Sequence, residues 1–272
     1  MPLDALGLAL AAAVLHAGWN VLLHGSEDVE ARTAGVAAFA VLLFAPVAAA
    51  TWSVQRAAVP YVAASAAFEI VYFALLIAAY RRRDLSVVYP VARGSAPVLV
   101  LIGSAVVLGT HVSAGEALGV CLVAAGVLFV RGVRHGAAGL PIALTIGCSI
   151  AAYTLVDKQG LHHASPIPYL ELTMTPVAIA LCAYVLVRRG AAPLRAQVNV
   201  PTLAAGAGSF GAYCLFLFAL RLAPAPGVAA VRETSVVFAA ALAALFLHER
   251  VTPMRIAGAA TVAGGVALLA LS

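Results

Sequence analysis

The chain has 272 residues, of which 64% are hydrophobic and only 10% charged. Soluble domains carry about 25% charged residues, so this composition excludes a soluble globular domain and predicts an all-α membrane protein. The formal net charge is +5, which raises the question of nucleic-acid binding. The distribution of the basic residues along the chain argues against that class of partner.

Ten apolar runs follow one another, each close to the roughly 20 residues that cross a bilayer core. Short connections rich in Arg, Pro and Gly separate them. The first run has Asp4 at its start and no Lys or Arg before it, so we expect a retained helix and not a signal peptide. The predicted helices are Leu3 to Leu23, Thr33 to Trp52, Tyr61 to Tyr80, Ser86 to Gly109, Ala114 to Val130, Leu140 to Val156, Pro168 to Val187, Thr202 to Leu220, Gly227 to Leu247, and Met254 to Leu271.

The basic residues are unevenly divided between the two sides of the predicted bundle. When the connections are counted alternately, 11 basic residues fall on the odd-numbered side and 3 on the other, and Arg93 and Arg232 inside spans complete the 16. Such an excess marks the cytoplasmic side, which places both termini outside a cell inner or plasma membrane. The odd side holds Arg32, Arg81, Arg82, Arg83, Arg131, Arg134, Arg188, Arg189, Arg195, Arg250 and Arg255, and the other side Arg56, Lys158 and Arg221.

An internal repeat is visible when the chain is compared with itself. A shift of about 140 residues aligns Arg81 with Arg221, Val91 with Val231, Ser95 with Ser235 and Arg93 with Glu233, and a one-residue gap then aligns Gly119 with Gly258 and Gly126 with Gly265. Chance similarity between two Ala- and Val-rich stretches is the alternative. Five helices per repeat is an odd number, so the repeats would be inverted, as in many secondary transporters. We expect one transmembrane domain over residues 1–272, with repeats of about 3–131 and 139–271.

Three segments resemble the EamA family of the drug/metabolite transporter superfamily. They are HAGWNVLLH (His16 to His24), AYRRRDLSVVYPVARGSAPVLV (Ala79 to Val100) and VRETSVVFAAALAALFLHERVTPMRIAGAATVAGGV (Val231 to Val266). The resemblance implies a ten-helix transporter of two five-helix repeats that moves small metabolites, often outward, by alternating access. It also implies cytoplasmic termini, whereas the charge count places them outside, so the orientation stays open.

Charged residues inside apolar spans are costly and usually belong to a pathway or a binding site. Arg93 could hold a substrate carboxylate or phosphate through its guanidinium fork, or it could bond carbonyls or a carboxylate between helices. Glu69 lies about mid-span and could bind an ammonium group, carry a coupling proton or pair with an arginine. Arg232 and Glu233 are adjacent and point about 100° apart on a helix, so we expect one to line a cavity and the other to tie its helix to a neighbour.

Other polar residues fall on the same predicted helix faces. His16 could titrate near neutral pH and is a second candidate for proton coupling, although a lone histidine can equally be a packing residue. Glu171 lies close to a span end, where we expect a solvated carboxylate. The remaining candidates for substrate binding are Asn20, Trp19, Tyr72, Tyr89, Tyr153 and Tyr213, whose aromatic rings could line a cavity or simply pack.

No catalytic or nucleotide-binding motif is found in the sequence, so we expect neither an enzyme nor a cofactor or metal. The leading hypothesis is a secondary transporter that exports a small polar metabolite, such as an amino-acid-like zwitterion or an organic anion. The alternatives are a proton-coupled exporter of hydrophobic cations and a non-transporting membrane assembly protein. The expected partners are a small-molecule substrate, the lipid bilayer and protons, in a monomer or homodimer without nucleic acid.

Overall fold

The computed structural model describes residues 1–23, 28–82, 85–131, 139–246 and 252–272. Nine helical segments in this part are long and apolar enough to span a membrane, and the shorter Ala114–Val130 adds a tenth, which confirms the predicted all-α membrane protein. The helices are α1 (Leu3–Leu23), α2 (Val29–Ala50), α3 (Val59–Arg82), α4 (Leu85–Val106), α5 (Ala114–Arg131), α6 (Leu140–Gly160), α7 (Pro166–Arg189), α8 (Ala192–Ala196), α9 (Val200–Leu222), α10 (Ala225–Arg232), α11 (Ser235–Phe246) and α12 (Pro253–Leu271), with a short 3-10 turn at Arg56–Ala58.

Two boundaries differ from the prediction in ways that matter for the site. Helix α6 continues to Gly160, so Asp157 lies inside the helix and is 1% exposed. The ninth predicted helix is broken between α10 and α11 at Glu233 and Thr234, whose backbone N–H groups bond the carbonyls three residues back. The Thr234 hydroxyl donates to the Val231 carbonyl at 2.7 Å. Such tight turns interrupt the regular ladder and turn consecutive side chains toward different neighbours.

The expectation of a solvated carboxylate at Glu171 is wrong. Glu171 is only 8% exposed, and α7 begins at Pro166, two residues before the predicted start. The predicted start at Pro168 placed this residue too close to the membrane surface.

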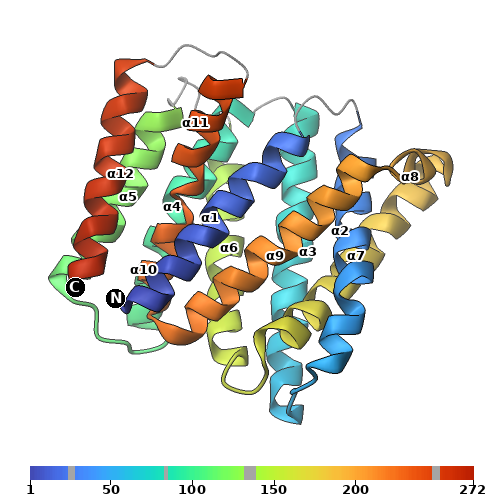
Figure 1. Ribbon diagram of the computed structural model, residues 1–272, viewed down its shortest axis with the longest axis horizontal. Helices are drawn as coiled ribbons and strands as arrows, with labels where there is room; N and C mark the ends of the chain where they lie inside the picture. The colour runs from blue at the N-terminus through green and yellow to red at the C-terminus, as the bar shows by residue number, and fades with distance from the viewer. Residues whose placement is uncertain (24–27, 83–84, 132–138, 247–251) are drawn as a thin grey trace.

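Both termini lie at one end of the bundle, and α8 lies at the other (Figure 1). We call these the terminal end and the α8 end. The principal helix pairs are α1 with α9, α4 with α6, α2 with α7, and α5 with α12. Each pair joins a helix of the first half of the chain to one of the second half, so the core is shared between the halves.

Helices α5 and α12 meet through glycines at two levels. A Cβ atom built on Gly126 would lie 2.8 Å from the Gly258 carbonyl oxygen, and one built on Gly265 would lie 2.8 Å from that of Gly119. These separations are shorter than real side chains allow, so the two backbones touch directly. Small residues permit this approach in membrane helices, where packing replaces a hydrophobic driving force.

The terminal end is closed by polar contacts between connections. The Gln55 N–H donates to the His163 carbonyl, and the Ser165 N–H donates to the Ser53 carbonyl, each at 2.9 Å. Lys158 of α6 donates to the carbonyls of Leu220 and Ala223, at 2.7 and 3.1 Å. Its ammonium group thus satisfies carbonyls at the end of α9 that have no partner within the helix.

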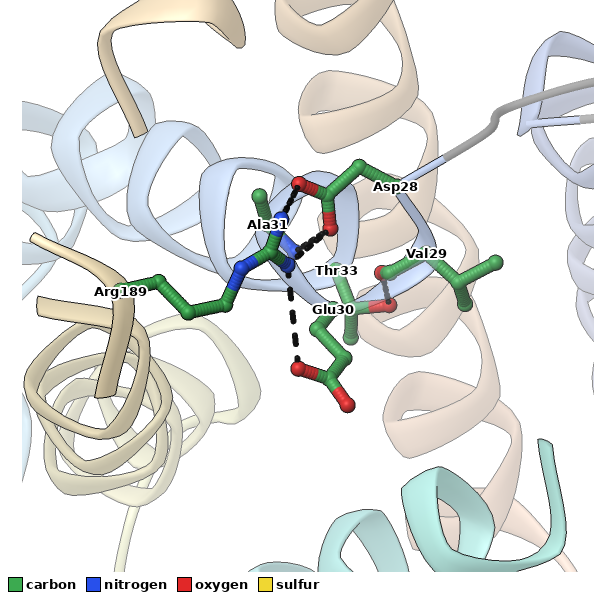
Figure 2. A network of polar contacts seen from close by, with 6 residues as sticks. All are labelled: Asp28, Val29, Glu30, Ala31, Thr33 and Arg189. Atoms are coloured by element: carbon green, nitrogen blue, oxygen red, sulfur yellow. Dashed lines mark hydrogen bonds and ion pairs between the residues drawn. The ribbon is translucent and has the colours of Figure 1, made fainter. Parts of the chain in front are cut away.

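The α8 end carries an exposed ion-pair network between α2 and α7 (Figure 2). Arg189, in the last turn of α7, donates to both carboxylate oxygens of Asp28 at 2.8 Å, and its Nη1 lies 3.9 Å from Glu30. Asp28 also accepts the Ala31 N–H and thereby caps α2. The hydrogen bond from Arg189 is the main cause that lowers the pKa of Asp28 from its ordinary 3.8.

Candidate functional site

A cavity of about 370 Å³ lies between the two halves of the chain. Its lining comes from the later part of α1, the first half of α2, the middle and second half of α3 and the first half of α4, all toward the α8 end, and from the first half of α7. Residues of α6 and α9 and the last residue of α10 form its floor. The cavity therefore extends from the middle of the bundle to the α8 end. Buried Leu217, Leu220 and Tyr169 pack the terminal end beyond it.

Most residues selected from the sequence share this cavity. It is lined by His16, Trp19, Asn20, Glu69, Tyr72, Tyr89, Arg93, Tyr153, Tyr213 and Arg232. Glu233 is absent from this lining, because the turn after α10 directs it toward α4. As expected from their positions on a helix, one of the two residues, Arg232, lines the cavity, and the other, Glu233, contacts a neighbouring helix.

Arg93 is held by the residue that the internal alignment places opposite it. Its Nε lies 2.8 Å from Oε2 of Glu233, and its Nη2 donates to the Ser235 hydroxyl at 3.2 Å. The two charged side chains are 5% and 4% exposed. The ion pair fastens α4 to the break between α10 and α11, so much of the charge of Arg93 is neutralised within the protein.

Arg232 has a different environment. Its guanidinium carbon lies 4.4 Å from the ring centre of Phe216 and 5.1 Å from that of Tyr213, so cation–π contacts position it. No carboxylate of the described residues lies within ion-pair distance of it, and none of them forms a hydrogen bond with its guanidinium. A guanidinium has five N–H donors. The floor of the cavity thus presents a fixed cation whose donors are available to a ligand.

Glu69 and Asp157 are joined through one tyrosine. The Tyr213 hydroxyl lies 2.8 Å from Oε1 of Glu69 and 2.7 Å from Oδ2 of Asp157. Asp157 also accepts hydrogen bonds from Ser65 at 2.5 Å and from Tyr169 at 3.0 Å. Both carboxyl groups are buried, at 3% and 1% exposed, but only Glu69 lines the cavity.

Asp157 is the residue that sequence reasoning missed. The predicted helix ended at Val156, which placed Asp157 in a connection at the membrane surface. A signal was present, because Asp157 follows Tyr153 by four residues and shares its helix face.

Arg32 was missed for a similar reason, because the predicted second helix began at Thr33 and left Arg32 in a connection, whereas α2 begins at Val29. Arg32 lines the cavity, and its Nε is buried without a hydrogen-bond partner in the described part of the chain.

Aromatic rings form a continuous series along the cavity. Tyr153 lies 6.2 Å from both Tyr72 and Tyr213 between ring centres. At the α1 wall, Trp19 meets His16 edge to face at 5.2 Å. The Trp19 Nε1 is buried and lacks a hydrogen-bond partner among the described residues, whereas the Asn20 amide donates to the His16 carbonyl. This wall suits a ligand with an apolar body and polar ends.

Comparison with known proteins identifies the second half of the chain. The model of the EamA-like transporter family matches residues 137–271. By this match, the second half of the chain belongs to the EamA-like transporter family. The resemblance noted in the sequence is thereby confirmed, and this family member is a multi-pass membrane protein of the drug/metabolite transporter type that acts on small molecules within a lipid bilayer.

Solved structures share this fold over nearly the whole chain. Among 27 matching chains, one protein of known crystal structure superposes with a TM-score of 0.77 and 14% sequence identity, over 98% of this chain and 95% of that one. At this identity the likeness concerns the fold alone. No curated protein matches this family member in sequence.

Proposed function

We propose that the protein is a secondary transporter that exports a small polar metabolite with an anionic group, such as an amino-acid-like zwitterion or an organic anion. The observation that carries the proposal is Arg232, a fixed cation on the floor of the cavity without an ion-pair partner among the described residues. A charge inside a membrane costs several kcal/mol, roughly 2.5 to 3.5 on insertion scales. The cation–π contacts to Tyr213 and Phe216 offset part of this cost, and a bound anion would offset more.

The chemistry of the lining narrows the ligand. A guanidinium binds carboxylate or phosphate oxygens in pairs, and the tyrosines provide an apolar wall with hydroxyl groups. Glu69 lines the same cavity and offers an acceptor for an ammonium group. A solute that carries both an anionic and a cationic end matches this combination better than a simple anion does.

Alternating access would follow from inverted repeats, and two sets of contacts support that arrangement. Arg93 contacts Glu233, its counterpart in the internal alignment. Two residues that are equivalent under a twofold rotation can touch only at its axis. The glycine contacts obey the same symmetry. Gly119 contacts Gly265, and their counterparts in the internal alignment, Gly258 and Gly126 respectively, contact each other. Exchanging the conformations of the two repeats would close the α8 end and open the terminal end.

A proton-coupled exporter of hydrophobic cations is the second candidate, favoured by the buried carboxyl of Glu69 among aromatic rings. Arg232 argues against it, because it would repel a cation at the floor of the same cavity. The two candidates therefore differ in which charged residue transport requires.

The experiment is exchange into proteoliposomes that contain the purified protein. Vesicles loaded with unlabelled amino acids are given either radiolabelled amino acids or radiolabelled tetraphenylphosphonium. We expect exchange of amino acids and its loss in Arg232→Gln, by roughly 10- to 100-fold, since a hydrogen bond to a charged group contributes about 1.5–3 kcal/mol. Arg221→Gln is the matched control, because Arg221 is exposed at the end of α9. Exchange of tetraphenylphosphonium alone, or amino-acid exchange that persists in Arg232→Gln, would refute the proposal.

A further inference from the structure

The hydrogen bonds around Tyr213 do not balance if both neighbouring carboxyl groups are ionised. Its hydroxyl has a single proton, yet it lies within 2.8 Å of one oxygen of Glu69 and 2.7 Å of one oxygen of Asp157. The phenol can donate to only one of them. The second contact would then join two lone pairs in a buried site, which is repulsive, unless that carboxyl group carries a proton and donates to the phenol oxygen.

The surroundings indicate which carboxyl group holds this proton. Asp157 accepts hydrogen bonds from Ser65 and Tyr169 in addition to Tyr213, and three donors stabilise an ionised carboxylate. Glu69 has only Tyr213 among the described hydrogen bonds. The consistent arrangement is a chain in which Glu69 donates to the Tyr213 oxygen and Tyr213 donates to Asp157.

The position of Glu69 makes this proton exchangeable. Glu69 lines the cavity, whereas Asp157 does not. The other ionisable groups of the cavity lining are Arg232, above the Tyr213 ring, Arg93, paired with Glu233, and Arg32, His16, Tyr72, Tyr89, Tyr153 and Tyr213 itself. On α7, Tyr169 donates to Asp157, and Glu171 is buried on the same helix. Of the described residues that line the cavity, Glu69 is the one with a carboxyl group, so it can pass a proton directly to water in the cavity.

We infer that Glu69, Tyr213 and Asp157 form a proton-binding site that couples transport to proton movement. When Glu69 releases its proton to cavity water, Tyr213 keeps its own proton, and this one hydroxyl proton then lies between two carboxylates. That state is unfavourable until a positive group approaches Glu69. The ammonium group of a bound zwitterion would supply this charge, so solute binding and proton release favour each other. This inference rests on the proposed function for the identity of the solute, but the proton site itself does not.

The proton site is tested without any substrate by infrared spectroscopy of the purified full-length protein as a function of pH. A protonated carboxylic acid absorbs at a carbonyl frequency distinct from that of a carboxylate. We expect wild type to show such a band at neutral pH, to lose intensity from it at alkaline pH, and to lose the same component in Glu69→Gln. Buried Glu171 can contribute a band of its own, so Glu171→Gln serves as the matched control and leaves the Glu69 component in place.

A second variant keeps the Glu69 carboxyl group and replaces that of Asp157 with an amide. In Asp157→Asn, Tyr213 can donate to an ionised Glu69 without conflict, so the Glu69 component should disappear at a lower pH than in wild type. The inference is overturned if Glu69→Gln leaves the spectrum unchanged, or if Asp157→Asn does not shift the titration. These outcomes are independent of the vesicle assay. Failure of amino-acid exchange with an intact Glu69 band would reject the solute and retain the proton site.

Discussion

The ion pair between Arg93 and Glu233 allows a quantitative test of the tertiary structure. Its charged atoms are 2.8 Å apart, and its side chains are 5% and 4% exposed. At an effective dielectric constant of about 20, two unit charges at this separation attract by roughly 6 kcal/mol, part of which is offset by the cost of removing them from water. Removing one partner leaves the other charge buried and uncompensated, which costs about 3–5 kcal/mol in comparable pairs. We therefore expect Glu233→Leu and Arg93→Met each to destabilise the protein by that amount.

Thermal unfolding in detergent measures the effect. For a chain of this size 1 kcal/mol corresponds to about 2 °C in Tm, so each single variant should unfold roughly 6–10 °C below wild type. The double variant Arg93→Met with Glu233→Leu should recover most of the loss, because well-packed apolar residues can replace a buried pair at little cost. Arg189→Met provides the control. It breaks an ion pair of the same 2.8 Å length that is exposed, and exposed pairs contribute at most about 1 kcal/mol.

Two results would refute this reasoning. If the Tm of each single variant falls by no more than that of Arg189→Met, the Arg93–Glu233 pair does not stabilise the protein as a buried ion pair should. If the double variant is as unstable as the sum of the singles, the two residues do not interact.

Three further outcomes are expected. Gly258→Ala should lower Tm, since its Cβ would lie 2.6 Å from the Val130 nitrogen, whereas Gly264→Ala on the same helix meets nothing within 4 Å and should be neutral or stabilising; equal shifts would contradict the glycine contact. Because Arg189 lowers the pKa of Asp28, the contribution of this pair to stability is full above the ordinary pKa of 3.8 and is lost as pH falls through the lowered value, so Asp28→Asn should flatten the acid side of a Tm-versus-pH profile. Lys158→Met removes the donor to two carbonyls and should lower Tm by an amount equivalent to about 1–3 kcal/mol; an unchanged Tm would show that these carbonyls find other partners.

The candidate site could be predicted in large part, because buried charge is rare in membrane spans and therefore conspicuous. Arg93, Glu69 and Arg232 stand out in runs of Ala, Val and Leu, and each lines the cavity. Asp157 could not be found in the same way. The predicted helix ended at Val156, whereas α6 ends four residues later at Gly160. This difference decides whether the Asp157 carboxylate is expected to be solvated or buried.

By itself, the sequence determined the number of apolar spans, the membrane class and the set of charged residues inside them, since bilayer thickness and the cost of buried charge act on any chain of this composition. Only the tertiary structure decided the partners. The break after Arg232 directs two adjacent charges apart, so Glu233 neutralises Arg93 while Arg232 faces the cavity. Tyr213 likewise joins Glu69 to Asp157 across 88 positions of sequence numbering, a contact that depends on the packing of α3, α6 and α9. Hydrogen-bond and ion-pair partners depend on distances of a few ångströms between helices, and such distances are set by packing.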